Sequence, residues 1–293
     1  MTEGIGGRLD LLPGLEERFH EWRGTRIRVF AGGEGPPLLL VHGFGGAAWN
    51  FTELQPYLTG RRLIVPDLPG HGRSSPLPAA ASLRGFADAL APLLDGPTDV
   101  FGHSLGGVVA LRLAERHPSL VRRVVVAAAA GISSSTRVAE LTISLIGIVQ
   151  PGRLAARRVE RIAASRRLRR LVFGGFEVSN AALLSERAVH GFLRGPREHT
   201  DALGAGLALA GDDPRHDLER VRCPVLVLWG ARDRQVPVED GFEYARRLRA
   251  PVRVIADCGH LLIGERPGVC AEAIENFLRF NPSERADPSR TPG

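Results

Sequence analysis

The segment Thr98-Asp-Val-Phe-Gly-His-Ser-Leu-Gly-Gly107 is the most informative part of the sequence, because a short apolar run in it leads into a Gly-X-Ser-X-Gly pattern. A helical pattern follows it to residue 117. A serine between a strand and a helix must sit on a sharp turn with strained backbone angles, and Gly102 and Gly106 remove the clashes that this turn would cause. The helix would direct its N-terminal amides at a developing oxyanion. The stretch therefore predicts a nucleophile at Ser104.

Short apolar runs bounded by turn residues recur on both sides of this stretch, and each is typical of a strand buried on both faces. Residues 16–31 alternate about Arg23-Gly24, which indicates a β-hairpin. Other strands are expected at 37–42, 62–67, 98–102, 122–128, 224–229 and 251–256, and helices at about 50–59, 82–94, 105–117, 238–249 and 267–279. Because strands and helices alternate, the predicted class is α/β with a mainly parallel sheet.

The alternation stops between residues 131 and 215, where no strand pattern is present. This stretch has the pattern of several helices, including an apolar one at 138–149 and an arginine-rich one at 153–171. Ligands of parallel sheets bind at the carboxyl ends of the strands, so a helical insertion there would cover the site. The expected organisation is a core of residues 1–130 and 216–280, a helical cap or lid of residues 131–215, and a disordered tail at 281–293.

A serine nucleophile needs a base, and the base needs a carboxylate to orient it. His260 follows the last predicted strand, and Asp233 follows the strand before it. Both therefore fall at the same edge of the sheet as Ser104. Asp257 is a second candidate for the acid, which we interpret as a turn residue. The predicted catalytic residues are Ser104, Asp233 and His260.

The segment His42-Gly-Phe-Gly-Gly46 follows the predicted strand at 37–41. Acyl transfer needs two backbone N–H donors that converge on the oxyanion. The residue after the nucleophile, Leu105, would supply one, and Phe44 would supply the other. The glycines allow the backbone to approach a substrate closely. We interpret His42 as structural.

The chain resembles the α/β-hydrolase superfamily over about residues 16–280. The resemblance rests on the motifs His42-Gly-Phe-Gly-Gly46, Asp67-Leu-Pro-Gly-His-Gly-Arg-Ser74, Gly102-His-Ser-Leu-Gly-Gly107, Trp229-Gly-Ala-Arg-Asp233 and Cys258-Gly-His260, with nucleophile, acid and base in the family's order. It implies an eight-stranded, mostly parallel sheet with helices on both faces and a helical cap between strands 6 and 7. It also implies a Ser104–His260–Asp233 triad, no metal or organic cofactor, and a structural role for the turn at 67–74.

Serine at position 104 argues against haloalkane dehalogenases and epoxide hydrolases, which use aspartate. The chain looks most like cap-bearing esterases and carbon–carbon bond hydrolases of the meta-cleavage type. The Phe-Gly-Gly loop lacks further polar residues, which favours ester hydrolysis. Carbon–carbon hydrolysis, acyl transfer and a non-enzymatic ligand-binding role stay open. The expected substrate is a small or medium, largely apolar ester, in a pocket lined by Phe44, Trp49, Leu145, Ile146, Val149 and Phe173.

The charge of the chain is carried by arginine, because all 38 basic residues are arginine against 32 acidic ones, giving a net charge of +6. The absence of lysine excludes Schiff-base and P-loop chemistry. Three cysteines without CxxC spacing and the lack of a signal-peptide pattern predict a cytoplasmic protein without stable membrane insertion. Eight arginines lie between residues 153 and 170: a solvated helix face, anionic-substrate steering or attachment to an acidic membrane surface could explain them. No motif predicts nucleic-acid binding, and no pattern predicts the oligomeric state.

Overall fold

A computed structural model of the chain describes residues 10–133, 151–175 and 177–279. The disordered tail predicted at 281–293 and the apolar helix predicted at 138–149 lie outside these residues.

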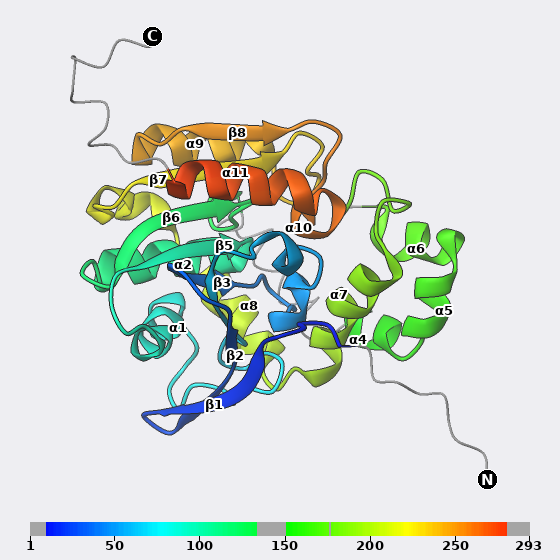
Figure 1. The fold of residues 1–293 in the computed structure, drawn as a ribbon, viewed down its shortest axis with the longest axis horizontal. Helices are drawn as coiled ribbons and strands as arrows, with labels where there is room; N and C mark the ends of the chain where they lie inside the picture. Colours follow the sequence, from blue (N-terminus) through cyan, green and yellow to red (C-terminus); the bar gives the residue numbers. More distant parts are fainter. Residues whose placement is uncertain (1–9, 134–150, 176, 280–293) are drawn as a thin grey trace.

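Eight strands form one sheet in the order β1-β2-β4-β3-β5-β6-β7-β8 (Figure 1). The pairs β1–β2 and β2–β4 are antiparallel, and every other neighbouring pair is parallel. The strands are β1 Glu16–Trp22, β2 Thr25–Gly32, β3 Pro37–Val41, β4 Arg62–Pro66, β5 Thr98–His103, β6 Val121–Ala127, β7 Val225–Gly230 and β8 Val252–Ile255. The predicted α/β class with a mainly parallel sheet is confirmed.

The central strands form where the apolar runs predicted them, because covering helices exclude water from both faces of that part of the sheet. The strand predicted at 251–256 is not buried on both faces, because β8 lies at the edge of the sheet with Arg253 and Val254 exposed. Every residue of β5 and β7 is buried. The hairpin between β1 and β2 turns at Arg23 and Gly24, both with positive φ. Two successive positive φ values match the right-handed twist of the flanking strands.

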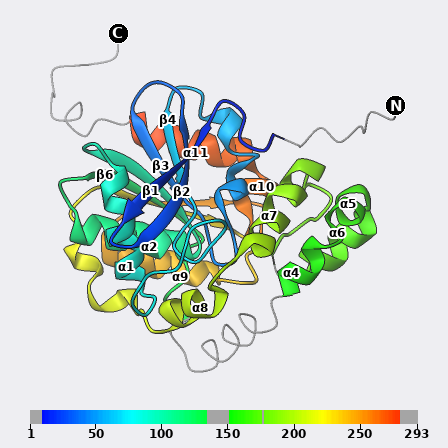
Figure 2. The ribbon, with the colours of Figure 1, turned by 90° about the horizontal axis from the view of Figure 1, so that it is seen from below.

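Helices cover both faces of the sheet. Figure 2 shows α11 on one side and α1, α2 and α9 on the other. Their bounds are α1 Leu83–Leu90, α2 Leu105–Arg116, α9 Val238–Leu248 and α11 Pro267–Arg279, and the short α10 spans Leu262–Glu265. The four longer helices were predicted within a few residues, and a 3₁₀ turn at Ala91–Leu93 completes the segment expected to be helical at 82–94.

One helix prediction in the core was wrong. Residues 50–59 form no α-helix; instead, two 3₁₀ turns span Ala48–Phe51 and Gln55–Tyr57. Pro56 lies inside the second turn, and proline has no backbone N–H to donate to the residue four positions earlier. The segment therefore breaks into short turns.

Five described helices lie between β6 and β7: α4 Pro151–Ala156, α5 Val159–Ala164, α6 Arg166–Phe173, α7 Glu186–Glu198 and α8 Ala202–Ala210. The arginine-rich stretch is not the single helix predicted at 153–171, because it breaks near Arg158 and again at Ser165. The Ser165 hydroxyl accepts a hydrogen bond from the Leu168 N–H and starts a new helix there. Figures 1 and 2 show α4, α5 and α6 as a lobe that projects away from the sheet. None of the described helices is long and apolar enough to cross a membrane.

Candidate active site

Ser104 lies on the turn between β5 and α2 with φ 56° and ψ −123°, a conformation that non-glycine residues rarely adopt. The surrounding backbone leaves no room for side chains at the flanking glycines. A Cβ at Gly102 would lie 2.1 Å from the Gly106 oxygen, and a Cβ at Gly106 would lie 2.2 Å from the Val41 oxygen. The glycines of the motif therefore permit a tight packing of strand, turn and helix that holds Ser104 in a strained conformation.

The structure brings together the three residues predicted from separate loops. The Ser104 Oγ lies 3.1 Å from the His260 Nε2, and the His260 Nδ1 lies 2.8 Å from the Asp233 Oδ2. Ser104 is 6% exposed and His260 is 2% exposed, so the chain of hydrogen bonds is shielded from water. This geometry allows His260 to take the hydroxyl proton while Asp233 orients the imidazole.

The Asp233 carboxylate is fixed by the backbone of its own loop. Its Oδ1 accepts hydrogen bonds from the N–H groups of Gln235 and Val236, both at 2.9 Å, which leaves Oδ2 for His260. The alternative acid, Asp257, is largely exposed, has a positive φ and pairs with Arg232. Asp257 is therefore the turn residue that the sequence indicated.

The segment after β3 comes close to the nucleophile. A Cβ at Gly43 would lie 3.0 Å from the Ser104 Cβ, so the loop backbone passes directly beside the serine. In the described part of the chain, neither the Phe44 N–H nor the Leu105 N–H donates to a protein acceptor. Leu105 is the first residue of α2, where backbone N–H groups lack a helical partner. Both predicted donors thus lack a protein acceptor among the described residues, and each adjoins a residue beside the reacting oxygen, Gly43 in one case and Ser104 in the other.

Three buried histidines, His42, His71 and His199, pack next to the loop that follows β3. His42 donates through Nδ1 to the Gly43 oxygen and accepts the Leu68 N–H at Nε2, so it is structural as interpreted. His71 packs between His42 and His199, with ring centroids 5.2 and 4.6 Å away. Burial lowers the pKa of all three, that of His42 to about 3, so the rings are neutral near neutral pH.

The turn at 67–74 joins this loop to the sheet. The buried Asp67 carboxylate accepts the N–H groups of Ala48 and Arg73 and pairs with Arg28 on β2. The Ser74 hydroxyl donates to the backbone carbonyl oxygen of Asp67. These contacts give the turn the structural role that the resemblance implied.

Sequence reasoning missed Glu265, a buried carboxylate at the end of α10 that is 3% exposed. Its Oε1 accepts from the Ser179 hydroxyl and the Asn180 N–H, at 2.8 and 2.7 Å. Its Oε2 accepts from the N–H groups of Gly259 and Ser179, at 2.7 and 3.2 Å. Glu265 therefore fastens the loop that carries His260 to the segment that follows α6.

Two further contacts act on the same loop. The His103 Nε2 donates to the His260 oxygen at 2.8 Å, and burial lowers the pKa of His103 to about 3. The Leu261 N–H donates to the backbone carbonyl oxygen of Glu177 at 2.8 Å. Removal from water raises the pKa of the Glu177 carboxyl to about 7, although the nearby His260 opposes this shift. The sequence held no signal for these contacts, because the partners are far apart along the chain.

The predicted pocket residues do not all lie together. Leu145, Ile146 and Val149 lie outside the described residues. Phe44 is half-buried and packs against His71, and Phe173 is buried against Phe192. Trp49 instead packs between Arg28 and Arg194, and it lines a hollow with Asp10, Leu11, Glu17, Arg28, Arg73 and Arg194 that contains no triad residue.

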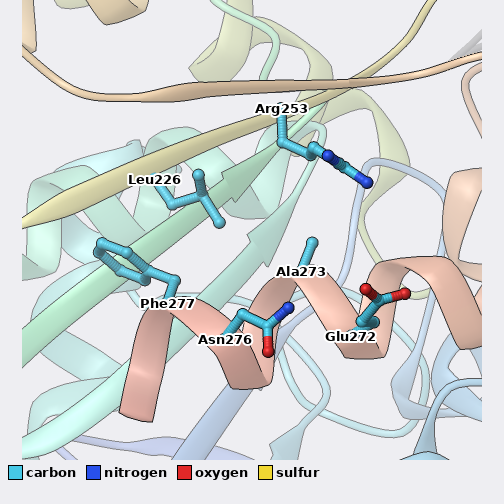
Figure 3. A pocket seen from close by; sticks show the side chains of 6 residues that line it. All are labelled: Leu226, Arg253, Glu272, Ala273, Asn276 and Phe277. Carbon is cyan, nitrogen blue, oxygen red and sulfur yellow. The ribbon is translucent and has the colours of Figure 1, made fainter. Parts of the chain in front are cut away.

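A second hollow lies between α11 and the strands β7 and β8 (Figure 3). It is lined by Leu226, Arg253, Glu272, Ala273, Asn276 and Phe277, and it too contains no triad residue. Within the described ranges, no three His, Cys, Asp or Glu side chains form a group that could hold a metal ion. The three cysteines are free thiols.

Comparisons with known proteins agree with this geometry. The family model described as the alpha/beta hydrolase fold matches residues 36–267. A pimeloyl-[acyl-carrier protein] methyl ester esterase of Aromatoleum aromaticum is 35% identical over 269 residues, which cover 83% of this chain and 98% of that protein. A dihydrolipoyllysine-residue acetyltransferase component of the acetoin cleaving system of Pseudomonas putida is 32% identical over 93% of this chain and 72% of that protein. A thermophilic esterase from Thermogutta terrifontis superposes with a TM-score of 0.68 at 26% identity, covering 90% of this chain and 98% of that one.

Proposed function

Because this chain belongs to the α/β-hydrolase family and is a carboxylesterase-like hydrolase, we propose that it cleaves carboxylic esters through an acyl-enzyme on Ser104. The observation that carries the proposal is the continuous line of hydrogen bonds from Ser104 through His260 to Asp233. A buried serine, imidazole and carboxylate in this order form the apparatus of nucleophilic acyl transfer.

The first half-reaction follows from the distances. His260 accepts the Ser104 proton at Nε2 as the serine oxygen attacks the ester carbonyl. Asp233 holds the proton on Nδ1 and stabilises the imidazolium that forms. The N–H groups of Phe44 and Leu105 donate to the oxyanion of the tetrahedral intermediate, and each such donor contributes about 3–4 kcal/mol to the transition state.

The alcohol then leaves with the proton from His260, which completes the first half-reaction and leaves the acyl group on Ser104. The second half-reaction uses the same groups with water as the nucleophile. A water molecule then loses its proton to His260 and attacks the acyl carbonyl. The acid is released, and Ser104 regains its proton. His260 makes every proton transfer in both half-reactions.

We further propose that residues 131–215 form a lid over the site and that the acyl group is small or medium and largely apolar. The contacts of Glu265 and Glu177 with the His260 loop support the first point, because they hold the segment after α6 against the catalytic histidine. Support for the second comes from the half-buried Phe44 of the loop after β3. Apolar walls with few polar groups are typical of small-molecule sites.

The test is a chain-length series of p-nitrophenyl esters, measured on the wild type and on Ser104→Ala. We expect turnover to peak above the acetate ester and to fall at least a thousandfold in the variant. Ser119→Ala is the matched control, because Ser119 is exposed beyond the far end of α2. A fluorophosphonate probe should label the wild type and the control but not Ser104→Ala. Near-wild-type turnover by Ser104→Ala would contradict the mechanism, and absence of labelling in the wild type would favour a ligand-binding role.

Acyl transfer is the second candidate, favoured by the relative named as an acetyltransferase component. The same acyl-enzyme would then pass its acyl group to an alcohol instead of water. Added alcohol acceptors would be converted to new esters in competition with hydrolysis. A vinylogous 1,5-diketone distinguishes carbon–carbon hydrolysis from ester hydrolysis, because only a carbon–carbon bond hydrolase would cleave it.

A further inference from the structure

The arginines of this chain differ in their partners. Many of those in the core pair with carboxylates, for example Arg28 with Asp67, Arg61 with Glu275, and Arg122 with Asp99. Six exposed arginines of the projecting lobe have no carboxylate partner in the described part of the chain: Arg157, Arg158, Arg161, Arg166, Arg167 and Arg170. The only acidic residue between 151 and 175 is Glu160, which contacts His190. The lobe therefore carries a concentrated positive charge that its own side chains do not neutralise.

Exposed leucines accompany these arginines. Leu154 is 58% exposed, Leu168 is 36% exposed, and Leu171 is 79% exposed. In α6 the opposite side is inward-facing, because Phe173 is buried against Phe192. Leu171 follows Arg167 by four residues, so the two side chains share one helix face. The outer surface of the lobe therefore carries both arginine guanidinium groups and exposed leucine side chains.

We propose that this arginine–leucine face, defined as Leu154, Arg157, Arg158, Arg161, Arg166, Arg167, Leu168, Arg170 and Leu171, docks the protein peripherally onto an anionic lipid surface. Arginines within reach of such a surface are attracted to its negative potential, and leucines between them can enter the boundary of the acyl region. A flat partner suits this face, because the lobe projects from the body of the molecule (Figures 1 and 2). The face is independent of the triad and does not rest on the proposed ester hydrolysis.

The experiment measures co-sedimentation with vesicles of phosphatidylcholine alone and of phosphatidylcholine with 30% phosphatidylglycerol, at low and at high salt. We expect the full chain to bind only the anionic vesicles and to be released by high salt, because surface charges are screened. One arginine near the surface contributes a factor of about five. The triple variant Arg166→Gln, Arg167→Gln, Arg170→Gln should therefore bind about 100-fold more weakly.

The matched control removes the same charge elsewhere, with Arg222→Gln, Arg249→Gln and Arg253→Gln. These three arginines are exposed on the core, and no carboxylate in the described ranges pairs with them. The control should bind like the wild type, because its arginines lie outside the face. Equal weakening in both triple variants would overturn the proposal, since it would show a response to net charge alone.

A leucine variant separates a lipid surface from an acidic polypeptide. Leu171→Asn should weaken binding to anionic vesicles about tenfold, because a leucine that enters the acyl region of the membrane contributes a large part of the apolar contact. It should leave binding to poly-L-glutamate, measured by fluorescence anisotropy, unchanged. Failure of the wild type to bind anionic vesicles at low salt would overturn the proposal. Binding to poly-L-glutamate without vesicle binding would assign the face to an acidic polypeptide instead.

Discussion

Replacing Glu265 by glutamine would leave two backbone donors facing an amide that cannot accept from them. The carboxylate now accepts four hydrogen bonds, from Ser179 Oγ, Ser179 N, Asn180 N and Gly259 N. A glutamine oxygen can keep the Ser179 hydroxyl and the Asn180 N–H. Its amide group would then point at the N–H groups of Gly259 and Ser179, which are donors themselves.

The magnitude follows from the burial of this side chain, which is 3% exposed and so cannot exchange its lost partners for water. Each buried donor left without an acceptor costs about 1–3 kcal/mol. The lower desolvation cost of a neutral amide offsets part of that loss. We expect the free energy of unfolding to fall by about 3 kcal/mol. Because Gly259 precedes His260, we also expect kcat to fall about 10- to 100-fold from misplacement of the imidazole.

The assay is urea unfolding combined with ester turnover and fluorophosphonate labelling. Glu272→Gln is the matched control, because Glu272 is exposed on α11 and changes the charge equally. A purely structural role would lower stability but leave kcat unchanged at a temperature where the variant is folded. If Glu265→Gln matched the control in both stability and kcat, the assignment of Glu265 as a positioning residue would be wrong.

Three more predictions follow from the same structure. Asp233→Asn should keep the fold but lower kcat about 10⁴-fold in ester assays, because its amide would favour the wrong tautomer of His260; a loss below tenfold would contradict this role. Gly102→Ala should lower the free energy of unfolding by about 3 kcal/mol in urea titrations, since its Cβ would clash with backbone; a wild-type midpoint would contradict this. Burial lowers the pKa values of His42 and His103 to about 3, so below the unfolded value of about 6.5 the unfolded chain binds more protons at these positions than the folded chain. These two groups together should lower the free energy of unfolding by about 2–3 kcal/mol per pH unit between pH 6 and 4. The lowered pKa values of His71 and His199 act in the same direction and the raised pKa of Glu177 acts against it, so a flat profile in urea titrations would refute this.

Local patterns predicted the sheet because the central parallel strands are short apolar runs and the β1–β2 hairpin alternates about Arg23-Gly24. They predicted the main helices because longer helical patterns separate those strands. They failed at 50–59, where Pro56 broke the helical pattern, and at 153–171, where Ser165 starts a new helix. Helix propensity favoured one long arginine-rich helix, but packing against α7 and local capping divided it. Element type was thus predicted better than element length.

The nucleophile turn at Ser104, the order of the strands along the chain, and the positions of Asp233 and His260 after their strands could all be predicted from the residues alone. The nucleophile motif consists of adjacent residues, and the fold class predicts which residues follow the ends of the strands. The contacts that support the triad could not be predicted in this way, because they depend on tertiary packing. Glu265 reaches Ser179, and His103 reaches the His260 backbone, through contacts between segments far apart in sequence. Such contacts depend on packing in three dimensions, which no local pattern of residues encodes.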